Sequence, residues 1–135
     1  MALTLHTFTV YDVTHFPLVV MRNEAIAPGY AVQWEKELEA LLHHAQPFVI
    51  LFPPGRPEAE DHEDRKRRMQ WFKANRERLS AVCRALISIE ADEEERESLR
   101  ARAADLVKVF GVPLEIAMSW EEAQALGARL TLCVD

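Results

Sequence analysis

PFVILFPPGRPEAEDHEDRKRR, residues 47–68, combines a buried strand, a break and the start of a helix. The apolar run FVILF is short enough for a strand that is covered on both faces. Two prolines and a glycine end it, and helical spacing begins at about Asp61 or His62. A strand that leads through a loop into a helix is the repeating unit of α/β folds. The rest of the chain contains further units of this kind.

The N-terminal part predicts a hairpin followed by a helix. Residues 7–13 (TFTVYDV) alternate and are rich in β-branched and aromatic types, and residues 17–22 (PLVVMR) resume that pattern. Because the two strands are close in sequence, we expect them to pair as a hairpin. In residues 30–44 apolar side chains recur at helical spacing, which indicates an amphipathic helix with one buried face.

The C-terminal half repeats the strand and helix units. ALISIE, residues 85–90, changes to a period of two and indicates a strand. A third helix follows and ends at Gly111, VPLEIAM (residues 112–118) is a last strand, and a capping box at residues 119–122 opens a fourth helix. The order ββαβαβαβα predicts one α/β domain over residues 1–135. We expect a single-layer, mostly parallel five-stranded sheet with four helices and one antiparallel strand at or near an edge.

Composition and charge narrow the class of protein. The 135 residues are 49% hydrophobic and 28% charged, and the formal net charge is −6. An acidic chain of this kind is repelled by nucleic acid, and acids flank the one basic cluster, RKRR at residues 65–68. We therefore expect no nucleic-acid partner.

Cysteine usage and the apolar runs point to the cytoplasm. Cys83 and Cys133 are far apart in the sequence, with no CxxC and no Cys/His spacing typical of a zinc site. No apolar run approaches the roughly 18 residues that a membrane span needs. MALTLHTFTV, residues 1–10, does not resemble a signal peptide. We expect a cytoplasmic protein with two free thiols and no membrane span.

The order and spacing of these elements resemble the STAS-like fold, also called SpoIIAA-like, of anti-sigma-factor antagonists and sulphate-transporter regulatory domains. The resemblance runs from FTVYDV through the closing unit PLEIAMSWEEAQALGARL. It implies a small protein-binding or ligand-binding domain that carries out no chemistry of its own.

One feature of those antagonists is missing. The family's phosphorylatable serine lies at the start of the helix that follows the strand corresponding to FVILF. Residues 53–79 contain no serine or threonine, and Ser80 comes near the end of that helix. A phosphoserine switch at that place is therefore excluded by the sequence.

Asp61, His62, Glu63 and Asp64 raise the question of a catalytic or metal site. Carboxylates and an imidazole could hold a metal that activates water, but consecutive residues on a helix point about 100° apart. A solvated helix start explains the cluster better, because acids favour the positive end of the helix dipole and Arg65 to Arg68 follow to offset them. We predict no metal, no cofactor and no catalytic residue here.

The loop PPGRP has the right position for a ligand. Ligands of open α/β sheets bind beyond the carboxyl ends of parallel strands, and this loop leaves such an end. Arg56, with His62 at the following helix start, could receive an anion or a nucleotide. The GxxxxGK pattern is absent and the nearby acids oppose an anion, so this remains the alternative.

Trp71, with Arg67 and Arg78, is the predicted partner surface. With Met69 at the centre of the apolar stripe, Trp71 falls on the outer face of its helix. An aromatic side chain flanked by arginines suits a protein partner, although Trp71 could instead cover a neighbouring loop or hairpin. Trp34 and Trp120 fall on apolar faces and are predicted to lie in the core.

Two functions follow from the sequence. The first is a non-catalytic binding or regulatory domain that acts through protein–protein contact, with an unidentified protein partner or a homodimer through a sheet edge. The alternative is a small-ligand protein, or a weakly specified enzyme, that uses the loop at residues 53–64. We favour the non-catalytic domain.

Overall fold

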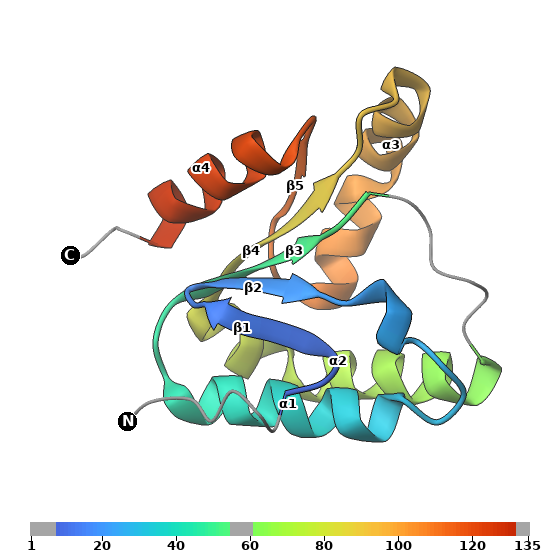
Figure 1. The fold of residues 1–135 in the computed structure, drawn as a ribbon. Coiled ribbons are helices and arrows are strands. Elements are labelled where there is room, and N and C mark those ends of the chain that lie inside the picture. Colours follow the sequence, from blue (N-terminus) through green and yellow to red (C-terminus); the bar gives the residue numbers. More distant parts are fainter. Residues whose placement is uncertain (1–7, 55–60, 132–135) are drawn as a thin grey trace.

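A computed structural model describes residues 8–54 and 61–131, and in that part the chain is an α/β structure with one five-stranded sheet and four α-helices (Figure 1). The sequence predicted this composition of elements. In chain order the elements are β1 (Tyr11–His15), β2 (Leu18–Met21), the 3-10 helix η2 (Asn23–Ala25), α1 (Ala31–His44), β3 (Phe48–Phe52), α2 (His62–Val82), β4 (Cys83–Ile89), α3 (Glu93–Phe110), β5 (Leu114–Ala117) and α4 (Trp120–Thr131).

The strands lie in their sequence order, β1-β2-β3-β4-β5. β1 pairs antiparallel with β2, while the pairings from β2 to β5 are parallel, so the sheet is mixed rather than mostly parallel. β1 forms one edge, as expected for the antiparallel strand of the hairpin. Because the parallel strands share one direction, their carboxyl ends meet at one edge of the sheet, at Met21, Phe52, Ile89 and Ala117.

The first strand begins four residues later than predicted. We expected a strand over residues 7–13, but β1 starts at Tyr11. The backbone N–H groups of Thr9, Val10 and Tyr11 donate to the carboxylate of Glu37 on α1. The Glu37 carboxylate thus accepts the hydrogen bonds that the backbone N–H groups of a longer strand would have donated to a neighbouring strand.

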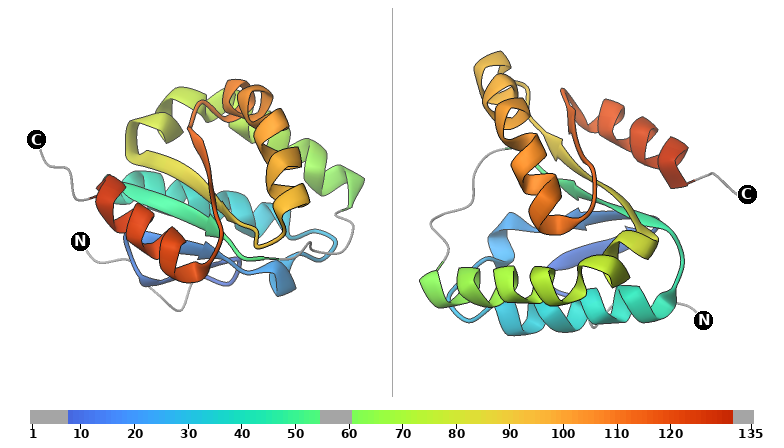
Figure 2. Two further views of the ribbon diagram at one scale, coloured as in Figure 1. Left: turned by 90° about the horizontal axis from the view of Figure 1, so that it is seen from above. Right: turned by 180° about the vertical axis from the view of Figure 1, so that it is seen from behind.

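Helices cover both faces of the sheet. α1, α2 and α3 lie on one face and α4 lies on the other (Figure 2). The strands alternate accordingly: Ile50 of β3 faces the three helices, whereas Val49 and Leu51 face α4. This arrangement explains why FVILF is continuously apolar, since its side chains are buried on both sides.

Gly127 lets α4 approach the sheet closely. A Cβ atom at this position would lie 2.6 Å from Cδ2 of Leu18 and 2.9 Å from Cγ2 of Val49. A side chain larger than hydrogen therefore cannot be placed there without moving β2 or β3 side chains.

α3 is held less tightly than the other helices. It packs against α2 and β5, and its N-terminal part projects beyond the sheet (Figures 1 and 2). None of its described side chains is fully buried. Its apolar stripe, which includes Leu99, Leu106 and Phe110, faces the sheet and is only partly covered. The space beneath this helix is therefore not fully filled by side chains.

Candidate functional site

A cavity of about 250 Å³ lies between α3, α2 and the sheet. Every strand contributes to its lining, and so do α1, α2 and α3. Most of the lining is apolar: Met21, Ile50, Phe52, Phe72, Leu86, Leu99, Leu106, Phe110 and Leu114. Four further side chains carry polar groups: Tyr11, Trp34, Arg68 and Ser88. An apolar pocket with a few convergent polar groups is the usual form of a small-molecule site.

The aromatic wall of the cavity is held by one edge-to-face and one tilted ring contact. The Trp34 and Phe72 ring centroids are 5.3 Å apart at 69°, and Phe72 lies 4.4 Å from Phe110 at 58°. Contacts of this geometry fix the orientation of the rings, in addition to the stabilisation that comes from burying their surface. The wall is therefore a preformed surface.

Tyr11 and Trp34 form a buried polar pair in this wall. The Trp34 Nε1–H donates to the Tyr11 hydroxyl oxygen at 2.8 Å. The hydroxyl accepts this bond, so its own proton can be donated elsewhere. Burial raises the pKa of Tyr11 far above its ordinary value, although the Trp34 bond and the Arg68 charge act in the opposite direction. Tyr11 therefore remains a neutral hydrogen-bond donor at physiological pH.

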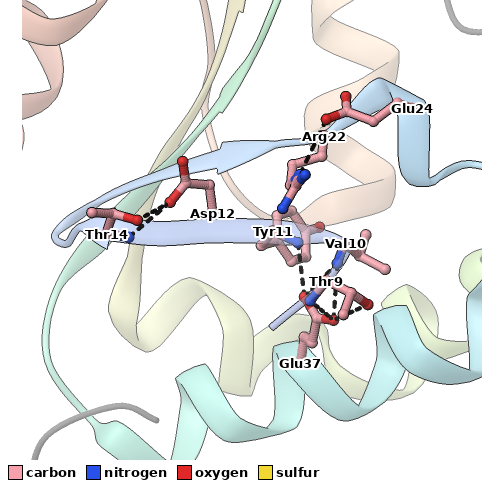
Figure 3. A network of polar contacts seen from close by, with 8 residues as sticks. All are labelled: Thr9, Val10, Tyr11, Asp12, Thr14, Arg22, Glu24 and Glu37. Atoms are coloured by element: carbon pink, nitrogen blue, oxygen red, sulfur yellow. Dashed lines mark hydrogen bonds and ion pairs between the residues drawn. The ribbon is translucent and has the colours of Figure 1, made fainter. Parts of the chain in front are cut away.

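Glu37 holds the strand that carries Tyr11. This side chain of α1 is only 2% exposed, and its carboxylate accepts from the N–H groups of Thr9, Val10 and Tyr11 at 2.8–3.1 Å (Figure 3). The Gln33 amide donates to it as well, at 2.8 Å. These bonds compensate the burial of the carboxylate and fix the start of β1 relative to α1.

Arg68 brings a positive charge to the cavity. Its guanidinium carbon lies 5.7 Å from the centroid of the Trp34 ring, a distance typical of a cation–π contact. The charge is also close enough to lower the pKa of Tyr11 against the effect of burial. It is the one charged side chain in the described lining of the cavity.

Ser88 places a hydroxyl on a face that is otherwise apolar. In β4 the side chains of Leu86 and Ser88 point to the same side, toward α2 and α3, and the neighbouring residue in β3 is Phe52. A serine in this position leaves more space than the branched residues of the other face. The small side chain of Ser88 and the incomplete burial of α3 both leave space for the cavity.

The predicted ligand-binding residues are not brought together in this cavity. Arg56 lies outside the described residues. His62 is the exposed first residue of α2 and does not line the cavity. Within residues 8–54 and 61–131, no group of three or more His, Cys, Asp or Glu side chains could hold a metal ion.

The acidic cluster is only partly the solvated helix start that we expected. Asp61 caps α2 by accepting from the Glu63 N–H at 3.1 Å, and Asp61 and Glu63 are exposed. Asp64 is buried instead and accepts from the N–H groups of Gly29 and Ala31, at 2.8 and 3.2 Å. It caps the start of α1 from the neighbouring helix.

The expectation that Trp71 lies on the outer face of its helix is wrong. Trp71 is 6% exposed, packs edge to face on Trp34, and donates from Nε1 to Glu39 at 3.1 Å. Arg67 and Arg78 are exposed and pair with Glu35 and Glu39 of α1. The reason is that α2 is buried on two sides, against the sheet and along α1.

The core predictions for other residues have mixed outcomes. Trp34 is buried as expected, whereas Trp120 is 38% exposed at the start of α4. Cys83 is buried, and burial raises the pKa of its thiol to about 12, so it is a poor nucleophile. Cys133 lies outside the described residues.

Sequence reasoning missed the residues that shape the cavity. The sequence indicates Arg68 only as one of four consecutive basic residues that balance the acids. It indicates Tyr11 and Trp34 only as a strand position and a core position. Ser88 is the one sequence signal for the cavity. It lies two residues after Leu86 and therefore on the same face of a strand whose other buried positions are apolar.

No family model, curated protein or solved structure matches this chain. None of the helices in the described part of the chain is long and apolar enough to cross a membrane.

Proposed function

We propose that this protein is a non-catalytic binding domain that holds a small molecule in the cavity between α3 and the sheet. The observation that carries the proposal is a preformed, mostly apolar space of about 250 Å³ whose described lining includes four side chains with polar groups, Tyr11, Trp34, Arg68 and Ser88. The position of the cavity agrees with the usual place of ligands in open α/β sheets, beyond the carboxyl ends of parallel strands. Phe52 and Ser88, at the carboxyl ends of β3 and β4, form part of its wall.

A binding role is favoured over catalysis by the chemistry of the lining. Tyr11 stays protonated, Arg68 stays charged, and the lining described here contains no carboxylate, histidine or cysteine to act as a general base. The groups that are present can bind and orient a ligand.

We also propose that the domain is STAS-like. The supporting observation is the strand order β1-β2-β3-β4-β5, with α1, α2 and α3 on one face and α4 on the other. Successive parallel units that advance in one direction with right-handed crossovers produce this layout. The missing serine in residues 53–79 separates the chain from the phosphorylated antagonists.

Filling the cavity tests the binding proposal. The Ser88→Ile variant adds a branched side chain to its wall, and Ser80→Ile changes an exposed serine of α2 as the matched control. Thermal unfolding is followed with a panel of small aromatic and aliphatic compounds that includes neutral, acidic and basic members. Compounds that raise the Tm of the wild type and of Ser80→Ile should have no effect on Ser88→Ile, because a ligand that binds only the native state stabilises it. Equal shifts in all three proteins, or no shift with any compound, would reject the cavity as the site.

Protein contact remains a second proposal, on a different surface from the predicted one. Met118 and Trp120 are 54% and 38% exposed and lie two residues apart where β5 meets α4. Two exposed large apolar side chains this close in the sequence favour a protein partner, which could be a second copy of this chain. Trp120→Ser should then lower the sedimentation coefficient of a self-associated species without lowering Tm. If the wild type sediments as a monomer up to high concentration, the second copy is excluded as that partner.

A further inference from the structure

The charges around the cavity decide which ligands can enter it. We infer that the cavity takes an uncharged aromatic compound, one ring with a short substituent, in preference to organic anions and cations of the same shape. This inference rests on the proposed function, because it concerns the ligand of the same cavity.

The volume of the cavity limits the size of the ligand. An apolar protein cavity of about 150 Å³ accommodates benzene. At about 250 Å³, the cavity between α3 and the sheet has room for one ring and a short substituent.

The wall favours an aromatic body. Five of the thirteen side chains in the described lining are aromatic: Tyr11, Trp34, Phe52, Phe72 and Phe110. Phe72 contacts Trp34 edge to face and Phe110 in a tilted geometry, so a further ring can join a set of rings that is already oriented. An aromatic ligand therefore gains ring contacts that a saturated ring of similar size lacks.

The guanidinium of Arg68 is already engaged by the protein. Its carbon lies 5.7 Å from the centroid of the Trp34 ring, and the side chain takes part in a further interaction besides this contact. An anionic ligand would have to compete with these contacts for a counter-charge. Removing an anion from water without such compensation is unfavourable, which also counts against the nucleotide considered from the sequence.

A cationic ligand finds no counter-charge in the described lining either. That lining contains no carboxylate, and apart from Arg68 its polar side chains are Tyr11, Trp34 and Ser88. Burial keeps the Tyr11 hydroxyl uncharged at physiological pH. A carbonyl or ether oxygen can accept from a neutral hydroxyl without bringing a charge into the cavity. An uncharged ligand with one such oxygen is therefore the class that the lining favours.

Four compounds of related shape test this inference on the wild-type protein. Acetophenone, benzoate and benzamidine each carry a small planar group on a phenyl ring, and at neutral pH they are neutral, negative and positive. In isothermal titration calorimetry, acetophenone should bind at least about tenfold more tightly than either ion, because only the ions lose the hydration of a full charge. 1-Cyclohexylethanone has a saturated ring in place of the phenyl ring and should bind at least about twofold more weakly than acetophenone.

Two measurements place the bound compound in the cavity. Ser88→Ile should abolish the binding of acetophenone, whereas Ser80→Ile, at an exposed serine of α2, should leave it unchanged. In the wild type, acetophenone should slow amide hydrogen exchange at Leu106 and Phe110, because α3 gains a packing partner beneath side chains that are only partly buried. Amides of α4, which covers the other face of the sheet, should change less.

The outcomes separate the inference from the proposed function. If either ion or the saturated ketone binds as tightly as acetophenone while exchange still slows at α3, the inference is wrong and the cavity remains a site. The same holds if acetophenone does not bind but compounds of the panel raise the Tm of the wild type and not that of Ser88→Ile. If acetophenone binds without slowing exchange at α3, or if no compound of either set binds, both the inference and the proposed function are overturned.

Discussion

The indole Nε1 of Trp71 donates a hydrogen bond to Oε2 of Glu39 at 3.1 Å and thereby joins α2 to α1. Arg78 donates to the same carboxylate at 2.8 and 3.2 Å. A tryptophan that the helical pattern assigned to a partner surface is therefore part of the contact between two helices, which lie side by side in Figure 1.

Substitutions of Trp71 should act on stability. Trp71→Ala removes a buried aromatic side chain and should lower the free energy of unfolding by about 3 kcal/mol or more. Trp71→Phe retains the ring packing and loses the bond to Glu39, so a loss of about 1 kcal/mol is expected. Urea unfolding measures both values. An unchanged urea midpoint for Trp71→Ala would show that this side chain does not stabilise the fold.

The stabilising effect of Glu39 should depend on pH. The hydrogen bond from Arg78, and then that from Trp71, lowers the pKa of this carboxyl below its ordinary value of 4.5, against partial desolvation. A carboxyl group with a lowered pKa in the native state stabilises above its unfolded-state pKa, and this contribution is lost as pH falls through the native-state value.

At pH 7 we therefore expect Glu39→Gln to lower the free energy of unfolding by about 1 kcal/mol, a modest value because the pair is half exposed. The difference from wild type should shrink as pH falls below 4.5. Denaturant unfolding of both proteins at several pH values measures it. A difference that is constant from pH 7 to pH 3 would contradict this account of the pair.

Glu37 should be among the most sensitive polar positions. Glu37→Ala leaves three consecutive backbone donors at the start of β1 without their acceptor and opens a space in the core, which should cost about 3 kcal/mol or more. Lys36→Ala, the exposed neighbour on α1, should change stability by less than about 0.5 kcal/mol. Amide hydrogen exchange at Val10 and Tyr11 should accelerate in Glu37→Ala. Unchanged protection there would show that other groups hold the strand.

Asp64 should stabilise the start of α1. Asp64→Ala removes the acceptor for the Gly29 and Ala31 N–H groups and should lower the free energy of unfolding by about 1–2 kcal/mol, as for a lost helix cap. Glu63→Ala, one residue earlier and exposed, is the control and should cost a few tenths of a kcal/mol. Chemical denaturation compares the two variants. Equal effects would favour the sequence-based interpretation that both acids are merely solvated.

The order of the elements could be predicted from sequence because it depends on local signals. FVILF, Gly111 and the Ser119 capping box each mark an element, and each element lies close to its predicted position. Such signals depend on neighbours within one or two turns of the chain.

The cavity and the α1–α2 contact could not be predicted, because they depend on how distant segments pack. A helical wheel assigns one buried stripe to α2, but this helix is buried on two sides, so Trp71 was placed wrongly. Tyr11, Trp34 and Arg68 come from three different elements and meet only in the folded chain. Glu37 and Asp64 looked like surface acids, since the sequence does not show the backbone donors that they satisfy across more than 25 residues.

The central claim is that the cavity beside Trp34 is the ligand site, and the three tryptophan indole N–H signals test it most directly. Trp34 lines the cavity, Trp71 packs on Trp34, and Trp120 lies on α4 at the other face of the sheet. In a 1H–15N correlation spectrum titrated with whichever small aromatic or aliphatic compound raises the Tm of the wild type most, the Trp34 signal should move most, with a smaller movement of Trp71 and none of Trp120. Movement of Trp120 with a stationary Trp34, or no movement of any indole up to the solubility limit of the ligand, would contradict the claim.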